Sequence, residues 1–413
     1  MNKELMTQRI AENLEHLKQF TATPNKGCTR LPFTKEARDA ANYIKDIMQK
    51  AGLEVKEDEA GNVFGFIYGS DTSLPCVMMG SHYDSVVNGG DYDGIAGVIC
   101  AIEVARQLNE KNTTPKRTFV AAAFCDEEGM RFGTGYFGSG AMLVGRTPEY
   151  CKTFTDKNDV SIYDAMLEYG LDPEKIGNAK WEDNSIGYFI EAHIEQGPVL
   201  HAENIQIGLV DCIVGIDRYM VTVHGRSDHA GTTPMNMRLD AVDAATKVIS
   251  KIADWARETD DGSVATVGYI KTIPGGMNIV AEACEFTVDI RSRNIENLEK
   301  ISAKLHDALK CEVKAMGGSF DIQNKLAITP VNLHQPMLSM MEESCKNHNF
   351  SYRYMHSGAG HDALEIGQVV PTAMLFVPSV DGRSHCMVEH TDYSHFGNAA
   401  LIMTELAEKL TAN

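Results

Sequence analysis

Side chains of the types that bind divalent metal ions lie at or just after the ends of several apolar segments of this chain. They are His82, Asp93, Glu128, His193 and His385, with a further acidic group, Glu127, beside one of them. Imidazole and carboxylate ligands together suit Zn²⁺, Mn²⁺, Co²⁺ or Ni²⁺, and a bridging carboxylate suits a pair of ions. Any one of these residues alone is better explained as a loop histidine or a solvated acidic turn. The prediction of a metal site therefore depends on their convergence.

The adjacent residues Glu127 and Glu128 carry the strongest physical constraint. Two buried carboxylates side by side lose their hydration and repel each other, which is costly unless cations lie close by. We therefore expect a metal-dependent enzyme. A metal-free binding protein on the same fold is an alternative, and the intact set of ligand types speaks against it.

The apolar segments that precede these residues predict the strands of one sheet. We expect buried strands at residues 76–79, 118–125, 188–192 and 373–377, and an amphipathic helix at 95–108. Apolar strands that alternate with helices are typical of a mostly parallel α/β sheet with helices on both faces. In such an open sheet, ligands bind beyond the carboxyl ends of the strands, where the candidate ligands lie.

The middle of the chain follows a different pattern. In chain order we expect a strand at 218–224, a helix at 240–257, strands at 264–270 and 284–290, a helix at 295–309 and a strand at 319–322. This order matches a small α+β sandwich of the ferredoxin-like type. It predicts an inserted domain at residues 213–329, for which the family resemblance given below implies a lid or dimerisation role. Residues 1–212 and 330–413 would form the catalytic, metal-binding domain around it.

Composition excludes several classes of partner. The formal net charge is −19, and no basic stripe is present that could neutralise the phosphates of nucleic acid or of an anionic membrane. No apolar run reaches the length of a membrane span. The ten cysteines form no CxxC pair, which favours a reducing compartment. We therefore expect a cytoplasmic protein.

Four short motifs resemble those of a known enzyme family. Residues 80–84, 91–94, 126–129 and 191–197 are similar to signatures of the aminoacylase/carboxypeptidase-type dinuclear metallohydrolases. Two further motifs, at residues 227–235 and 357–363, narrow the resemblance to the hydantoinase/carbamoylase branch. The resemblance covers nearly the whole chain. The segment at residues 383–389 departs from the family pattern around its ligand.

The resemblance implies two divalent ions per chain, Zn or Mn, with Co or Ni also possible. It implies that Asp93 bridges both ions, that His82 and His193 bind one, and that Glu128 and His385 bind the other. A carboxylate bridge with imidazoles on both sides agrees with the ligand chemistry of such pairs.

Three more roles follow from the same resemblance. Asp84 would receive the free N–H of His82 and fix its tautomer. Glu127 would take a proton from water and pass it to the leaving nitrogen. His229, in the inserted domain, would donate a hydrogen bond to the carbonyl oxygen as it becomes an oxyanion. The resemblance also implies a homodimer through the inserted domain, in which His229 serves the partner's site.

The resemblance further implies a small ureido acid as substrate. Arg291 would bind the substrate carboxylate through a bidentate fork, and Asn278 would hold its polar end. Gln196, Arg218 and Gly360 are the other expected pocket contacts. Taken without the family, Arg218 and Arg291 are more simply exposed residues at strand ends, and Asn278 is a turn residue.

The expected reaction is hydrolysis of a ureido C–N bond with release of ammonia and carbon dioxide. Arg218 and the segment at residues 355–363 favour an enzyme of the allantoate amidohydrolase type. The alternatives are hydrolysis of N-carbamoyl-L-amino acids or of N-carbamoyl-β-alanine, the β-ureidopropionase reaction. An aminoacylase or peptidase with the same metal site is a further, more distant alternative.

Overall fold

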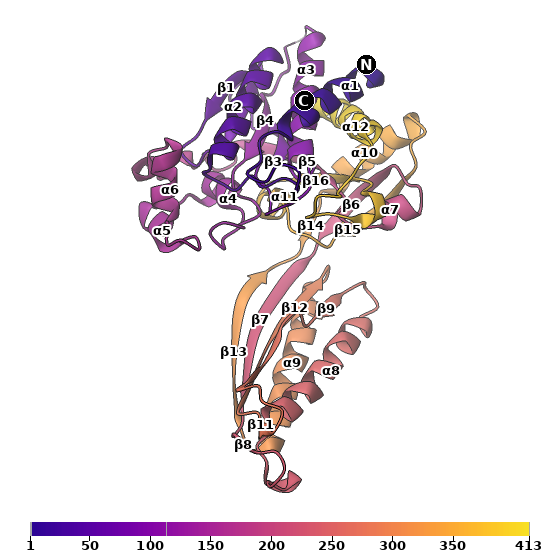
Figure 1. The fold of residues 1–413 in the computed structure, drawn as a ribbon. Coiled ribbons are helices and arrows are strands. Elements are labelled where there is room, and N and C mark those ends of the chain that lie inside the picture. Colours follow the sequence, from indigo (N-terminus) through magenta and orange to yellow (C-terminus); the bar gives the residue numbers. More distant parts are fainter. Residues whose placement is uncertain (1, 113, 413) are drawn as a thin grey trace. The chain divides into compact units, whose positions relative to one another are not determined.

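The computed structural model describes residues 2–112 and 114–412, and these divide into two compact units. Unit 1 consists of Met1–Asp211 and Asn332–Asn413, and unit 2 of Cys212–Val331. Figure 1 shows the elements of each unit. The catalytic and lid or dimerisation roles that the sequence suggests for the corresponding regions stay predictions.

Unit 1 is built on a sheet whose four central strands run parallel. Within the described residues the sheet has nine strands, in the order β1-β2-β4-β3-β5-β16-β6-β14, with β15 paired to β6. They are β1 (Glu54–Glu57), β2 (Val63–Ile67), β3 (Cys76–His82), β4 (Phe119–Phe124), β5 (Ile186–Ile194), β6 (Ile207–Ile213), β14 (Val331–Asn332), β15 (Tyr352–Ser357) and β16 (Thr372–Val377). Strands β4, β3, β5 and β16 are parallel neighbours, and β1, β2 and β6 pair antiparallel at the flanks.

The central strands are apolar because helices cover them. Every residue of β3, β4 and β16 is buried. Helix α3 (Ile95–Glu110) packs on β3 and β4, α12 (Tyr393–Thr411) packs on β16, and α11 (Asp362–Ile366) packs on β5 and β16. A strand covered on both faces needs no polar alternation, which explains the continuous apolar runs in the sequence. The predicted fold class, a mostly parallel sheet with packed helices, is confirmed.

The helices of unit 1, including the three named above, complete its shell. They are α1 (Lys3–Leu17), α2 (Lys35–Lys50), α3 (Ile95–Glu110), α4 (Phe137–Val144), α5 (Pro148–Thr153), α6 (Ile162–Tyr169), η1 (Pro173–Ala179), α7 (Val199–Ala202), α10 (Gln335–Asn347), α11 (Asp362–Ile366), η3 (Val380–Gly382) and α12 (Tyr393–Thr411). Helices α1, α3 and α12 pack against one another. None of the described helices combines the length and apolar character that crossing a membrane requires.

Unit 2 is an α+β sandwich with the predicted order of elements. Its main sheet runs β10-β12-β7-β13, with β9 also paired to β12, and all its pairs are antiparallel. The elements are β7 (Gly215–His224), β8 (Asp228–His229), η2 (Met235–Met237), α8 (Ala241–Arg257), β9 (Val264–Thr266), β10 (Ile270–Ile273), β11 (Ile279–Val280), β12 (Ala283–Ser292), α9 (Ile295–Met316) and β13 (Ser319–Ile328). Helices α8 and α9 lie along one face of this sheet (Figure 1).

One detail of the prediction for unit 2 is wrong. The single strand expected at residues 264–270 is interrupted, and β9 and β10 flank a gap that contains Gly268. Glycine has no side chain to pack and weakens a strand interior, which accounts for the break.

Helix α3 approaches the sheet most closely at Gly97. It begins two residues after Asp93, so its position also sets that of the loop carrying this ligand. A Cβ at position 97 would lie 2.2 Å from the carbonyl oxygen of Ala192 and 2.8 Å from the Cβ of Ser81. Ala192 precedes His193 on β5. The absence of a side chain therefore lets α3 seat directly beside two strands that carry candidate ligands.

We predict that Gly97→Ala destabilises the protein by about 1–3 kcal/mol, because the helix must move away from β5 to admit the methyl group. At an unconstrained helical site the same change would instead stabilise by roughly 0.5–1 kcal/mol. The measurement is the midpoint of urea unfolding. Gly177→Ala is the control, since a Cβ there would meet only the Arg146 carbonyl oxygen at 4.0 Å. Equal midpoints for the two variants would contradict the close approach.

Candidate metal centre

The carboxyl ends of three parallel strands bring metal-type side chains to one edge of the unit 1 sheet. His82 is the last residue of β3, and His193 is the next-to-last residue of β5. Glu127 and Glu128 follow β4, and parallel pairing places β4 beside β3. The carboxyl ends of neighbouring parallel strands meet at the same edge, so the fold itself assembles these groups.

Asp93 lies at the centre of the cluster, between three imidazole rings. Its Oδ1 atom is 3.0 Å from His193 Nε2 and 3.5 Å from His82 Nε2. Its Oδ2 atom is 3.3 Å from His385 Nε2, and this imidazole nitrogen is in turn 3.4 Å from Glu128 Oε1. One carboxylate therefore faces two histidines through one oxygen and a third histidine through the other.

Both histidines on the strands present Nε2 toward Asp93. His193 Nδ1 lies 2.9 Å from the carbonyl oxygen of Ile194, to which it can only donate. The backbone N–H of Gly94 donates to His193 Nε2 at 3.2 Å, so that nitrogen carries a lone pair. His82 Nδ1 lies 3.3 Å from the carbonyl oxygen of Asp84. These contacts favour the tautomer in which Nε2 is available as a metal ligand.

The donor set fits divalent cations. Asp93 Oδ1 is buried and has no hydrogen bond in the part of the chain that the structure describes, although two imidazole nitrogens face it. A lone pair that faces other lone pairs requires a proton or a cation between them. Three ligand groups have atoms that lie within 4.8 Å of one another: His82, Asp93 and His193; Asp93, Glu128 and His385; and His82, Glu127 and Glu128. The first two groups share Asp93, as a bridge between two ions would.

Electrostatics in the cluster reflect crowded carboxylates. Burial raises the pKa of Glu127 well above its usual value, and the negative charge of Glu128 adds to the shift. Burial and the charge of Asp93 raise the pKa of Glu128 to about 7. The hydrogen bond to Asp93 raises the pKa of His385 to about 9. Each shift has the direction expected where negative charge is concentrated without enough positive charge.

Asp84 contacts both sides of the site, although its carboxylate is not the group nearest to His82. His82 Nδ1 lies 3.6 Å from Asp84 Oδ1, farther than from the Asp84 carbonyl oxygen. The carboxylate instead accepts the backbone N–H groups of Glu127 at 3.1 Å and of Glu128 at 3.3 Å. Asp84 thus fixes the turn that carries both glutamates.

Glu389, which the sequence analysis did not single out, holds the Asp93 loop. Its Oε1 accepts the backbone N–H groups of Tyr92 at 3.0 Å and of Asp93 at 3.2 Å. The Ser384 hydroxyl lies 2.8 Å from Glu389 Oε2 and 3.2 Å from Asp93 Oδ2. The atypical segment at residues 383–389 therefore supports the central carboxylate. Only the tertiary contact reveals this role.

Gln196 lies at the metal cluster. Its Nε2 donates to Asp93 Oδ2 at 2.8 Å and lies 3.3 Å from His385 Nε2. The predicted pocket residue is therefore in direct contact with two predicted metal ligands.

Several non-glycine residues around the cluster adopt left-handed backbone conformations. The φ angles are 60° at Asp126, 57° at Tyr136, 58° at Gln196 and 54° at His385. Such conformations cost on the order of 1–3 kcal/mol each and persist only where the surroundings enforce them. Their concentration here indicates that the loops bearing Glu127, Gln196 and His385 are held in imposed geometries.

Tyr136 explains why position 360 is glycine. A Cβ on Gly360 would lie 1.8 Å from the Tyr136 phenol oxygen. Burial, with the charge of Glu127, raises the pKa of Tyr136 well above its usual value, so the phenol stays protonated at neutral pH. The predicted pocket residue Gly360 thus lies against Tyr136, whose pKa is raised in part by the charge of Glu127. No spacing or motif in the sequence pointed to Tyr136.

The predicted oxyanion donor lies in unit 2 with its tautomer defined. The backbone N–H of Gly231 donates to His229 Nδ1 at 3.0 Å, which leaves the proton on Nε2. The short pair of β8 with β11 places His229 opposite Ile279, and the carbonyl oxygen of Asn278 accepts the Ala230 N–H at 3.0 Å. Within unit 2, then, His229 and Asn278 belong to one small substructure, with a ring N–H that can act as a donor.

The two predicted substrate arginines also lie together in unit 2. Arg218 on β7 and Arg291 on β12 both hydrogen-bond to Asp289. The sequence analysis did not single out Asp289, although its place two residues before Arg291 puts both side chains on one face of the strand.

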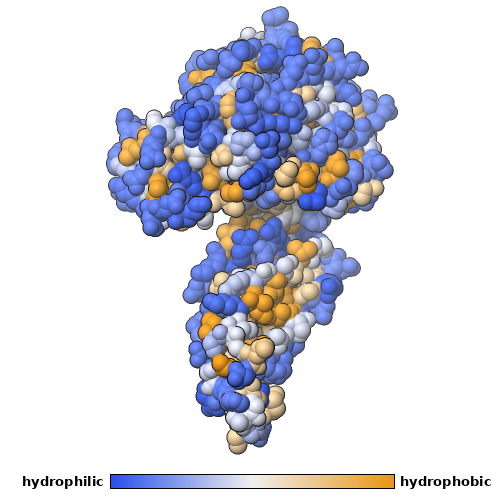
Figure 2. Space-filling model, in the orientation of Figure 1, coloured by the Kyte–Doolittle hydropathy of each residue, from blue (hydrophilic) through white to orange (hydrophobic). Residues whose placement is uncertain are grey.

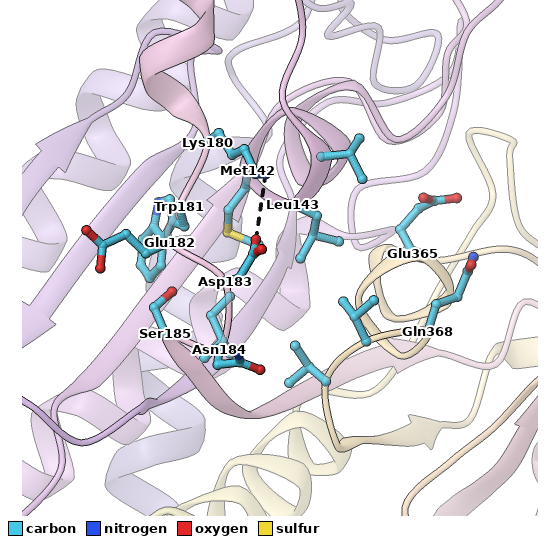
Figure 3. Close-up of a pocket in the computed structure, with 14 residues that line it drawn as sticks. Met142, Leu143, Lys180, Trp181, Glu182, Asp183, Asn184, Ser185, Glu365 and Gln368 are labelled. Atoms are coloured by element: carbon cyan, nitrogen blue, oxygen red, sulfur yellow. Dashed lines mark ion pairs between the residues drawn. The ribbon is translucent and has the colours of Figure 1, made fainter.

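A separate cavity of unit 1 lies away from the cluster. It has a volume of about 540 Å³ and is lined by Lys180, Asp183, Ile186, Glu365 and other residues (Figure 3). Ile186 begins β5 and His193 lies at the other end, so seven residues at ~3.3 Å each separate them by roughly 23 Å. The Lys180–Asp183 ion pair of 3.6 Å, drawn in Figure 3, is its main charged feature. This cavity is not the site of the metal-type ligands.

Comparisons with known proteins show which family the chain belongs to. A model of the peptidase family M20/M25/M40 matches residues 78–409. The chain is 36% identical over 408 residues to an N-carbamoyl-L-amino-acid amidohydrolase of Paenarthrobacter aurescens, covering 99% of each. It is 36% identical over 401 residues to an allantoate amidohydrolase of Bacillus subtilis strain 168, covering 97% of each. A crystal structure of a hydantoinase/carbamoylase-family amidase from Burkholderia multivorans matches with a TM-score of 0.90 at 30% identity, covering 98% of each chain. The resemblance inferred from the sequence is confirmed.

The overlapping ligand groups can be told apart by metal content. We predict that Glu128→Gln loses about half of the bound Mn²⁺, because a neutral amide is a weaker ligand, while Glu127→Gln keeps the wild-type content. Metal per chain is measured by plasma mass spectrometry after dialysis into metal-free buffer. The two variants are matched, since they remove the same charge one residue apart. Equal loss from both would show that Glu127 is itself a ligand.

Proposed function

Because the chain belongs to the peptidase family M20/M25/M40, we propose that it hydrolyses the ureido C–N bond of a small carboxylic acid, with release of ammonia and carbon dioxide. The observation that carries this proposal is the cluster in which Asp93 joins two groups of metal-type ligands beside Glu127. The relatives named above, which cover nearly the whole chain, support the choice of a carbamoyl or ureido group over a peptide bond.

We propose two divalent cations per chain, Zn or Mn, with Co or Ni as other possibilities. Asp93 would be a ligand of both, His82 and His193 would hold one, and Glu128 and His385 would hold the other. The orphaned Oδ1 of Asp93 and the Nε2 orientation of the strand histidines support this assignment. When bound, the cations supply electrostatic activation of water and of the substrate carbonyl.

Proton transfer falls to Glu127. Its Oε2 lies 3.8 Å from His82 Nε2, at the border of the cluster, and its raised pKa suits a group that both accepts and releases a proton. Water attacks the ureido carbon, Glu127 takes one water proton, and that proton passes to the terminal nitrogen as its C–N bond breaks, which releases ammonia and leaves a carbamic acid on the other nitrogen. The carbamic acid then loses carbon dioxide as its N–C bond breaks, and its O–H proton passes to that nitrogen to give an amine. His229 donates its Nε2–H to the carbonyl oxygen as negative charge develops there.

We assign substrate recognition to five residues. Arg291 binds the substrate carboxylate, with Arg218 as its neighbour, because a planar guanidinium fork suits a carboxylate. Asn278 contacts the polar end of the substrate. Gln196 and Gly360 line the pocket beside the metal ligands.

We propose allantoate as the preferred substrate, since a second arginine at position 218 suits its additional polar ureido group. The second candidate is an N-carbamoyl-L-amino acid. The near-full-length match to the carbamoylase of Paenarthrobacter aurescens favours it as strongly as the Bacillus subtilis match favours allantoate.

We expect ammonia release from allantoate by the enzyme reconstituted with Mn²⁺, Zn²⁺ or Co²⁺. The panel also contains N-carbamoyl-L-amino acids, N-carbamoyl-β-alanine and ureidoglycolate, together with a dipeptide and an N-acetyl amino acid whose hydrolysis is followed by amino-acid release. Faster turnover of an N-carbamoyl-L-amino acid would reverse the order of the two candidates. Hydrolysis of the dipeptide or acetyl compound alone would overturn the proposed bond specificity.

We also propose a homodimer formed through unit 2, in the cytoplasm. Strand β10 is at the edge of the unit 2 sheet, and Val264, Tyr269 and Ile270 near this edge are exposed apolar residues. Figure 2 shows apolar surface on unit 2. An exposed apolar sheet edge suits pairing with a second copy of itself. All ten cysteines are free, which supports a reducing compartment.

If His229 serves the partner's site, two inactive variants restore activity when mixed. A heterodimer of Glu127→Gln with His229→Ala then has one site with both defects and one intact site. Random exchange makes half of the dimers mixed, so we expect about one working site in four, measured as ammonia release. If subunit exchange is confirmed but no ammonia release returns, His229 acts within its own chain.

A further inference from the structure

Asp289 binds Arg291, the proposed carboxylate anchor, and also Arg218, the second proposed substrate-binding arginine. Arg218 donates to Asp289 Oδ2 through Nε at 2.9 Å and through Nη2 at 2.8 Å. Arg291 donates through Nε to Asp289 Oδ1 at 2.8 Å and through Nη2 to Oδ2 at 3.4 Å. One carboxylate of the protein therefore engages two nitrogens of each guanidinium.

The sheet register makes this arrangement a consequence of the fold. Arg218 on β7 is the antiparallel partner of Asp289 on β12. Asp289 and Arg291 are two residues apart, so they project from the same face, while Val288 and Ile290 are buried in the core under α8 and α9. The three charged side chains thus share the face of the sheet opposite the helices.

The group has a defined charge. Burial acts to raise the pKa of Asp289, but the hydrogen bonds and charges of Arg291 and Arg218 lower it below its usual value, so the carboxylate is ionised at neutral pH. Two guanidinium charges and one carboxylate charge leave a net charge of about +1, which follows from their ionisation states at neutral pH. Asp289 is thus a counter-ion that the two guanidinium groups share.

We propose that Asp289 is a specificity-determining residue, which sets the anchor to accept a single substrate carboxylate and to discriminate against substrates with a second one. This inference rests on the proposed function of Arg218 and Arg291. Asp289 accepts from two nitrogens of each guanidinium and thereby fixes the orientation of both groups. Its own charge repels a second carboxylate on the ligand, whereas the first is matched by the net positive charge.

The test compares two ligands of equal size that differ by one charge, N-carbamoyl-L-asparagine and N-carbamoyl-L-aspartate. We expect Asp289→Asn to shift the ratio of kcat/KM toward the aspartate compound by on the order of tenfold. That size reflects a unit charge change at a partly solvated site, where water screens the interaction. Asp289→Ser removes the same charge with less bulk and must shift the ratio in the same direction.

Asp217→Asn is the matched control. Asp217 lies beside Arg218 in the chain, but its carboxylate accepts hydrogen bonds from Ser302 at 2.6 Å and Tyr219 at 3.2 Å. This variant removes the same charge from the same strand pair without releasing either arginine. An equal shift in Asp217→Asn would reduce the effect to general electrostatics and overturn the proposal.

Binding separates this inference from the proposed reaction. The same two compounds are titrated calorimetrically into Glu127→Gln and into Glu127→Gln/Asp289→Asn. The wild-type enzyme could fail to hydrolyse any ureido compound while Glu127→Gln/Asp289→Asn binds N-carbamoyl-L-aspartate more tightly than Glu127→Gln does. In that case the proposed reaction is wrong and the proposed role of Asp289 stands. An unchanged ratio of affinities, or binding of neither compound, would overturn the role of Asp289.

Discussion

Negative charge buried at the edge of one sheet is the constraint on which the rest of unit 1 depends. Asp93, Glu127 and Glu128 lie close together, and the cationic-type groups nearest to them are the histidines of the cluster, not lysines or arginines. A carboxyl group whose pKa is raised in the folded state destabilises folding above its usual pKa. Cations bound at the proposed site would remove that penalty, and metal binding would then be coupled to folding at this edge.

The surrounding structure meets this constraint with rigid supports. Asp84 holds the turn of the two glutamates, and Glu389 holds the loop of Asp93 through backbone N–H groups. Left-handed backbone at Asp126 and His385 fixes the direction in which the adjoining side chains leave the chain. Close packing of α3 at Gly97 ties the Asp93 loop to β5. Preorganised ligands of this kind bind metal without first having to order themselves.

Much of this site could be predicted because the signal is local in the sequence. An apolar run followed by a ligand type identifies both a strand and its functional end, as at His82 and His193. The sequence did not predict the roles of Glu389, Tyr136 and Asp289. These roles depend on partners far away in the chain, or on an adjacent strand whose register cannot be read from the sequence. The interruption at Gly268 was missed for another reason, since alternation of apolar residues continues across it. Local pattern therefore predicted the residues that cluster at this edge of the sheet, and tertiary contacts identified what holds them.

The discontinuity of unit 1 has a consequence for biosynthesis. Strand β16 lies between β5 and β6 in the sheet, yet it follows unit 2 in the chain, and His385 comes later still. While the ribosome is still making unit 2, the strand β16 that separates β5 from β6 has not been synthesised. The ligand group of Asp93, Glu128 and His385 also still lacks His385. Domains generally fold as units during synthesis, so unit 2 can fold before residues 332–413, the last segment of unit 1, have been synthesised. Full occupancy by metal would then mark a chain that has been translated to its final helix, and a prematurely terminated product could not acquire it.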